Sequence, residues 1–179
     1  MARLPELETP RLCIIPFNEQ LLTERYVDWL NDPEVVRYSE QRHRHHDLAG
    51  CTAYFRSFEN SPHYFCAILH KGTPEEHIGN ISIAMDCANR VADISIMIGE
   101  KQYWGQSLGA EAWKCVMEEL FVHQNIRKIT AGTMAINHGM LAVMKRCGME
   151  EEGRRKRQFL CDEQEVDMVM AAAFVHSLK

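Results

Sequence analysis

The sequence predicts an α/β (α+β) fold in which helices cover both faces of one mixed sheet. Three observations predict it. Apolar strand-like stretches and amphipathic helical stretches follow one another in the order β-α-α-α-β-β-β-α-β-α-β-β. The last two strands read as a hairpin around a short polar turn. The chain has 179 residues and is 46% hydrophobic, which is enough for one buried core without stabilisation by disulfide bonds or metal ions.

Composition limits the classes of function. We expect one domain over residues 1–179. The net charge of -5 gives no reason to expect nucleic acid as a partner, and no apolar run is long enough to predict a membrane span. The first six residues turn acidic, so we expect no signal peptide. The seven cysteines include no C-x-x-C pair, which favours reduced thiols in a cytoplasmic protein over disulfides or a metal site.

The N-terminal third is expected to be mainly helical. Asn31-Asp32-Pro33 predicts a new helix start, because Pro is favoured in the first turn. Asp47 can cap the helix that follows a polar, basic loop. The expected elements are a strand over residues 11–16, helices over 21–30, 34–38 and 47–58, and a loop over 39–46.

The rest of the chain is expected to form the main part of the sheet. The strands are expected over residues 63–70, 77–85, 91–99, 128–134, 152–160 and 165–172, with turns at 71–74 and 161–164. Helices are expected over 108–122 and 137–147, the second ended by Gly148. In the strand over 91–99, Asp93, Ser95 and Met97 share one face.

The segment between the strand over 91–99 and the helix over 108–122 has the composition of a phosphate cradle. A helix N-terminus carries unpaired backbone N–H groups and a partial positive charge, which attract phosphate. Small residues let a phosphate approach the backbone, and the segment supplies Gly105, Ser107, Gly109 and Ala110.

With these residues in view, the chain resembles the GNAT superfamily of acetyl-CoA-dependent N-acetyltransferases, and most closely its RimJ/RimL-like branch. The resemblance covers nearly the whole chain. It is carried by residues 8–12, 29–35 and 78–81, by the cradle, and by Asn137 with Gly148-Met149. It implies a GNAT fold, with a mostly antiparallel seven-stranded sheet and a V-shaped splay between the fourth and fifth strands.

The resemblance also implies a binding site. Acetyl-CoA would be the co-substrate, with no metal. Its pantetheine would bond to the backbone of Met97 and Ile98 and to Asn137. Its pyrophosphate would sit on the amides of the cradle, which are those of Gln106, Ser107, Leu108, Gly109 and Ala110.

The chain departs from the family pattern at three positions. Trp104 stands where the loop commonly has Arg or Gln, and Ser107 stands at the first Gly. Ser still offers its N–H, so we expect the site to be retained. Met144 stands where many members have a Tyr that protonates the leaving thiolate. A thiol pKa of about 8.5 makes the thiolate a tolerable leaving group, so this loss lowers the rate without forbidding the reaction.

The residues also suggest catalytic roles. The backbone N–H of Met97 or Ile98 can stabilise the tetrahedral oxyanion. Asp93 matches the place where some relatives carry a Glu base, and the shorter Asp would act through a bridging water. The alternative is that Asp93 is a solvated Asp at a strand edge.

The resemblance implies that the connections after the first helices form the acceptor wall, which here includes the loop over residues 40–46. Tyr38, Glu40, Gln41 and Arg42 are the candidate substrate-binding residues, and a His of residues 43–46 is a second candidate base. The alternative is a solvated basic loop. The basic run over 154–157 is expected on a C-terminal strand, with a structural or homodimer role rather than contact with nucleic acid.

The sequence therefore predicts an N-acetyltransferase acting on a primary amine. The favoured acceptor is a small molecule such as an amino sugar nucleotide. A polyamine, a protein N-terminus and a non-catalytic CoA-binding module are the alternatives.

Overall fold

The computed structural model describes residues 4–72 and 76–175, which share one eight-stranded sheet with the strand order β1-β2-β3-β4-β5-β6-β8-β7. Seven of these strands match the expected ones, and β1 is the additional strand. The bounds are β1 Leu7–Glu8, β2 Leu12–Pro16, β3 Tyr64–His70, β4 Glu76–Asp86, β5 Val91–Ile98, β6 Lys128–Met134, β7 Glu150–Cys161 and β8 Gln164–Phe174.

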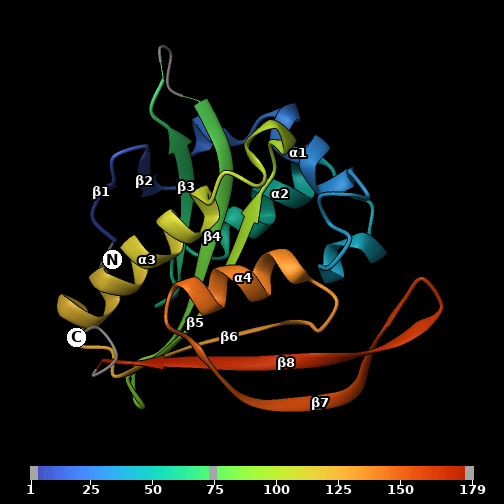
Figure 1. The fold of residues 1–179 in the computed structure, drawn as a ribbon. Coiled ribbons are helices and arrows are strands. Elements are labelled where there is room, and N and C mark those ends of the chain that lie inside the picture. Colours follow the sequence, from blue (N-terminus) through green and yellow to red (C-terminus); the bar gives the residue numbers. More distant parts are fainter. Residues whose placement is uncertain (1–3, 73–75, 176–179) are drawn as a thin grey trace.

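The sheet divides at its single parallel junction. All other neighbouring strands pair antiparallel, whereas β5 and β6 pair in parallel through only three residue pairs, ending at Asp93 and Thr130. Beyond that pair the two strands separate. In Figure 1, β3, β4 and β5 run upright while β6, β8 and β7 cross below them. The predicted V-shaped splay is thereby confirmed, and its apex lies at Asp93.

Helices cover both faces of the sheet, as the sequence predicts. The helices are α1 Glu24–Asn31, α2 Leu48–Arg56, α3 Leu108–Val122 and α4 His138–Arg146. The buried side of α3, including Trp113, packs on one face with Ile81 and Ile94. Residues of α1 and α2, such as Tyr26 and Cys51, pack with Phe65 of β3 on the other. Figure 1 shows α3 and α4 together on the near side of the sheet.

The expected helix over residues 34–38 does not form. The segment is a series of turns, in which the Asp32 side chain accepts from Glu34 N at 2.9 Å. Five residues form too few helical bonds to offset the cost of nucleation. The chain instead forms a short 3-10 helix at Glu40–His43, inside the expected loop, and Ser39 caps it.

The two expected turns between strands have different outcomes. Asp162 and Glu163 both have positive φ, at 49° and 62°, which suits a tight hairpin between β7 and β8. The expected turn over 71–74 lies partly outside the described residues. None of the helices in the described ranges is long and apolar enough to cross a bilayer.

Candidate functional site

The splay leaves the β6-facing edge of β5 without a strand partner beyond Asp93. Successive strand residues direct their N–H and C=O groups to opposite edges. Gly99 N donates to Ile78 O of β4 at 2.9 Å, so the alternate residue Met97 also faces β4. A Cβ added at Gly79 would lie 2.2 Å from Met97 O, which supports this direction. Ile98 therefore turns its backbone groups into the splay, and of the two expected oxyanion donors the geometry favours Ile98.

Trp104 lies at the outer end of this open edge. Its Nε1 donates to the carbonyl oxygen of Ile98 at 2.8 Å. The indole is 43% exposed and lines the cavity described below. Gly105 follows with a φ of 74°, so the chain turns sharply from the indole toward α3. The residue that replaces the family's Arg or Gln thus contacts the strand backbone.

The start of α3 presents free backbone donors to the same space. Ser107 is the N-cap, with a left-handed φ of 63°, and the first helical bond runs from Glu111 N to Ser107 O at 3.1 Å. The amides of Leu108, Gly109 and Ala110 therefore have no partner within the helix. A Cβ at Gly109 would meet Ile98 and Val143 at 3.8 Å, so the helix start lies close to both sides of the splay.

Residues near the N-terminus hold this loop in place. Thr9 Oγ1 donates to Glu111 Oε1 at 2.6 Å, and Arg11 pairs with Glu111 Oε2 at 2.6 Å. Arg11 Nη1 also donates to the carbonyl of Gln106 at 3.1 Å. The Arg11 guanidinium thus fixes the loop from behind. This contact explains why the family resemblance includes both residues 8–12 and the cradle.

The helix α4 supplies the opposite wall. Arg146 Nη1 donates to Ser107 Oγ, which places a cation beside the free amides of α3. Asn137 caps α4, since its Oδ1 accepts from Met140 N at 3.1 Å, and its Nδ2 donates to Thr133 Oγ1 at 3.1 Å. An amide that binds both its own helix and β6 has a fixed direction, as a ligand contact requires.

These parts border one cavity of about 1160 Å³. Most of the expected site residues line it: Tyr38, Glu40, Gln41, Met97, Ile98, Ser107, Leu108, Gly109, Ala110 and Asn137. Gln106, Arg42 and Asp93 do not. The cavity runs from the cradle past the open edge of β5 to the wall formed by residues 34–47. A cavity of this size, with few convergent polar groups, is typical of a small-molecule site.

Asp93 lies at the apex of the splay, outside the lining of the cavity. Its Oδ2 accepts from Thr130 Oγ1 at 2.6 Å. Desolvation raises the pKa of the Asp93 carboxyl, and the Thr130 hydrogen bond opposes part of that rise. Because Asp93 does not line the cavity, its role as the base stays a prediction.

Met144 is also outside the cavity. It is 3% exposed and belongs to the core cluster that includes Leu108 and Trp113. The position where many members carry a Tyr is therefore filled by a packed apolar side chain.

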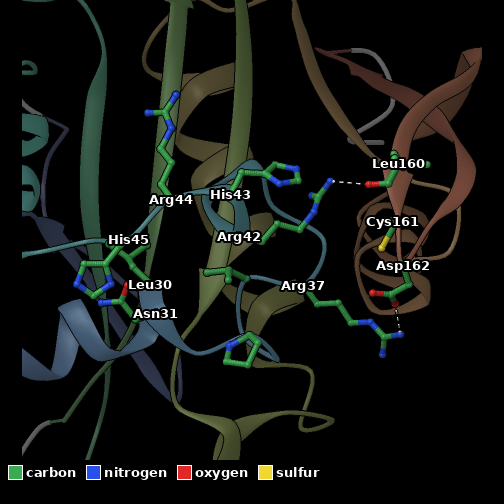
Figure 2. A pocket seen from close by; sticks show the side chains of 12 residues that line it. Leu30, Asn31, Arg37, Arg42, His43, Arg44, His45, Leu160, Cys161 and Asp162 are labelled. Atoms are coloured by element: carbon green, nitrogen blue, oxygen red, sulfur yellow. Dashed lines mark hydrogen bonds and ion pairs between the residues drawn. The ribbon is translucent and has the colours of Figure 1, made fainter.

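Arg42 lies outside the lining of the large cavity, and its role in substrate binding stays a prediction. Its guanidinium donates to the carbonyl of Leu160 at 3.3 Å, and Arg37 pairs with Asp162 at 3.1 Å. Figure 2 draws both contacts. Arg42 also pairs with Glu40 at 3.0 Å. Both arginines border a second cavity of about 500 Å³ between residues 30–45 and the β7–β8 turn. The two arginines thus connect residues 37–42 to the β7–β8 hairpin.

Sequence reasoning missed the floor of the cavity on the α1–α2 side. Asn80 and Ser82 of β4 and Ser95 of β5 line it together with Tyr54 of α2. The alternation of polar residues in these two strands was the available signal. It was weak, because the same alternation also suits a solvated sheet face.

Comparisons with known proteins agree with this arrangement. The sequence of residues 11–150 matches the family model described as an acetyltransferase (GNAT) domain. No curated protein matches the sequence. Spermidine N-acetyltransferase from Vibrio cholerae, in complex with CoA and spermine, is similar with a TM-score of 0.83 and 14% identity, over 94% of this chain and 98% of that chain.

Two further solved structures share the fold. Ribosomal-protein-S5-alanine acetyltransferase from Vibrio fischeri has a TM-score of 0.82 and 14% identity, over 98% of this chain and 99% of that one. RimJ from Mycobacterium smegmatis, in complex with CoA-disulfide, has a TM-score of 0.78 and 17% identity, over 93% and 83%. Because the family model covers most of the chain and the fold agrees, this protein belongs to the GNAT acetyltransferase family.

Proposed function

We propose that this protein is an acetyl-CoA-dependent N-acetyltransferase, acting as one domain over residues 1–179. It moves the acetyl group to a primary amine by direct attack within a ternary complex. One observation carries the proposal. Three features border the same cavity: the open backbone edge at Ile98, the free amides at the start of α3, and Asn137, which caps α4.

The cavity fits acetyl-CoA by its chemistry. The unpartnered amides of Leu108, Gly109 and Ala110, together with the Arg146 guanidinium, form an anion site for the pyrophosphate. The open edge of β5 also includes Ile96, which lies two residues before Ile98 and so directs its backbone groups into the splay as well. This edge offers a strand-like hydrogen-bonding surface to the amide groups of pantetheine, and Asn137 borders the same cavity. The thioester then lies between the open edge and the acceptor wall.

The reaction requires few protein groups. The amine nitrogen attacks the thioester carbon and forms the C–N bond, the C–S bond breaks, and CoA leaves as a thiolate. The Ile98 N–H stabilises the oxyanion formed on the way. The amine proton passes through water to Asp93. A thiol pKa of about 8.5 allows the thiolate to leave without an acid at position 144.

The favoured acceptor is a small molecule such as an amino sugar nucleotide. Tyr38, Glu40 and Gln41 line the acceptor wall, and Arg37 and Arg42 fasten that wall to the β7–β8 hairpin. A spermidine-type polyamine and a protein N-terminus are the alternatives, since structures of similar fold carry those names.

The test has two stages. Calorimetry with acetyl-CoA should show binding, and a thiol-release assay over a panel of amines should show amine-dependent release of CoA. The panel should include an amino sugar nucleotide, spermidine and a peptide with a free N-terminus. Failure to bind acetyl-CoA would refute the proposal.

A second candidate is a CoA-binding module without turnover. It is favoured by Met144, which is buried in the core at the position of the usual acid. Tight binding of acetyl-CoA with no CoA release from any amine would support this candidate over the enzyme.

A further inference from the structure

Asn80 is a buried side chain with an unused donor. It is 4% exposed, lies in β4 and lines the cavity on the side of α1 and α2. No group among the described residues accepts a hydrogen bond from its Nδ2. Buried polar groups in folded proteins are nearly always paired, so an unpaired donor at the border of a cavity points to a ligand.

The direction of the Asn80 amide is set by His77. Nε2 of His77 lies 2.9 Å from Asn80 Oδ1 and 3.0 Å from Gly79 O. The carbonyl oxygens of Asn80 and Gly79 can only accept hydrogen bonds, so Nε2 of His77 must carry the proton. The amide oxygen therefore faces His77, and Nδ2 points away from it. The rings of Trp29 and Phe17 hold the imidazole, with centroids 4.8 and 5.9 Å away.

A bulge makes this contact possible. Gly79 pairs with Ile68 and His77 pairs with the next residue, Leu69, so Ile78 is an extra residue in β4. An extra residue shifts the alternation of side chains by one. His77 and Asn80, which a regular strand would place on opposite faces, therefore share one face.

The surrounding floor is neutral and polar. Ser82, Ser95 and Tyr54 join Asn80 there. The carboxylates in the described lining are Glu34, Glu40 and Asp47, and all three come from the wall over residues 34–47. The lining residues of β4 and β5 can therefore form hydrogen bonds with oxygen atoms of an acceptor. They offer no carboxylate that could pair with a second ammonium group. Met97, the cross-strand neighbour of Asn80, has an unbranched side chain that can move aside for a ligand.

We propose that Asn80 is a specificity-determining residue that donates from Nδ2 to an oxygen atom of the acceptor. The site then prefers amines that carry a hydroxyl or carbonyl oxygen near the nitrogen over amines with only a carbon skeleton. His77 is the positioning residue that holds the Asn80 amide in this direction. The inference rests on the proposed acetyl transfer to an amine and narrows its acceptor class.

The test uses two amines of similar ring size, glucosamine and cyclohexylamine. Asn80→Leu removes the donor and should lower the glucosamine-to-cyclohexylamine ratio of kcat/KM about tenfold. Asn80→Ala removes the same donor without adding apolar bulk and should lower this ratio as well. Asn89→Leu, the same exchange at an exposed turn, should leave the ratio of the two values unchanged.

The positioning role has its own readout. His77→Phe should lower the preference for glucosamine, while His77→Gln should restore it, because a Gln amide can still donate to Asn80 Oδ1. Thermal unfolding of each variant checks that it folds. If Asn80→Leu does not fold, Asn80→Ala carries the test. An unchanged ratio in the folded Asn80 variant would overturn the proposal.

Binding separates this inference from the proposed function. Calorimetry of the two amines with the CoA-saturated protein measures the same preference without turnover. If no amine of the panel is acetylated but the affinity ratio falls in the Asn80 variant, acetyl transfer fails and the role of Asn80 stands. If amines are acetylated and neither ratio changes, acetyl transfer stands and the role of Asn80 fails. Absence of binding and turnover for both glucosamine and cyclohexylamine would overturn the role of Asn80, whereas CoA release with other amines of the panel would retain the proposed acetyl transfer.

Discussion

Nε1 of Trp104 donates to the carbonyl oxygen of Ile98 at 2.8 Å. The indole therefore lies against the backbone edge to which pantetheine is proposed to bind. Trp104 is 43% exposed, whereas the other two tryptophans, Trp29 and Trp113, are 5% and 0% exposed. Among the three indoles, Trp104 is the one that lines the cavity beside that edge.

This contact makes Trp104 a reporter of binding. Acetyl-CoA should change the intrinsic fluorescence of the protein, because it alters the surroundings of the exposed indole. Trp104→Phe should abolish that change, and Trp29→Phe should retain it. A titration of each variant by fluorescence, with binding confirmed by calorimetry, gives the answer. Persistence of the full signal in Trp104→Phe would place the ligand elsewhere.

Arg146 should contribute to cofactor affinity. Its guanidinium bonds to Ser107 Oγ beside the free amides of α3. Arg146→Gln should weaken acetyl-CoA binding about tenfold, the loss expected for one charge-assisted hydrogen bond. Lys145→Gln is the matched control, because Lys145 precedes it in α4 but does not line the cavity. Equal losses in the two variants would indicate a general effect of charge, with no specific phosphate contact.

Asp93 can be tested as the base through turnover and pH together. Asp93→Asn should lower kcat and leave the Kd for acetyl-CoA nearly unchanged, because Asp93 lies outside the cavity. A base acts when deprotonated, and desolvation raises the pKa of Asp93 above the ordinary 3.8. Activity of the parent should therefore rise with pH through this raised pKa, and the variant should lack that limb.

The control for this prediction is Asp86→Asn, at the turn that joins β4 to β5. It should keep the parent turnover and pH profile. Unchanged turnover in Asp93→Asn would remove Asp93 as the base and leave the interpretation of a solvated strand-edge residue.

His77 should make stability depend on pH. Desolvation lowers the pKa of His77 below its ordinary value of 6.5. The unfolded chain then binds a proton at pH values where the folded protein does not, so the free energy of unfolding falls as the pH drops below 6.5. His77→Gln removes this proton uptake. Denaturant unfolding should therefore show that the parent loses stability relative to the variant between pH 7 and pH 5.

The same comparison should be flat above pH 7, where both states of His77 are neutral. A difference that stays constant from pH 7 to pH 5 would mean that His77 takes up its proton equally well in both states, which contradicts its buried, donating position.

The cradle was predictable because it depends on local sequence. Small residues between an apolar strand and an amphipathic helix place free amides at a helix start, whatever the rest of the chain does. The start of α4 at Asn137 was predictable for the same reason, whereas a contact of Asn137 with pantetheine is implied only by the resemblance. The splay was predicted only through the resemblance to a family, because composition and residue spacing alone give no signal for it.

The misses depend on contacts between distant segments. Residues 34–38 have a helix start signal, but the Asp32 side chain and the short span favour turns. The contact of Arg42 with the carbonyl of Leu160, far along the chain, likewise gave no signal in the sequence. The pair of His77 and Asn80 needs the bulge at Ile78, and a bulge is set by the pairing of β3 with β4 and not by either strand alone.

The three-residue junction between β5 and β6 has a consequence for the protein before it meets a ligand. Residues 94–98 and 131–134 are two strand edges that face each other inside the sheet without pairing. Such edges can recruit any extended peptide, including one from a second molecule. A pantetheine arm bound along these edges would form the hydrogen bonds that a neighbouring strand would otherwise form. Occupancy of the site should therefore protect the chain against self-association as well as supply the acetyl group.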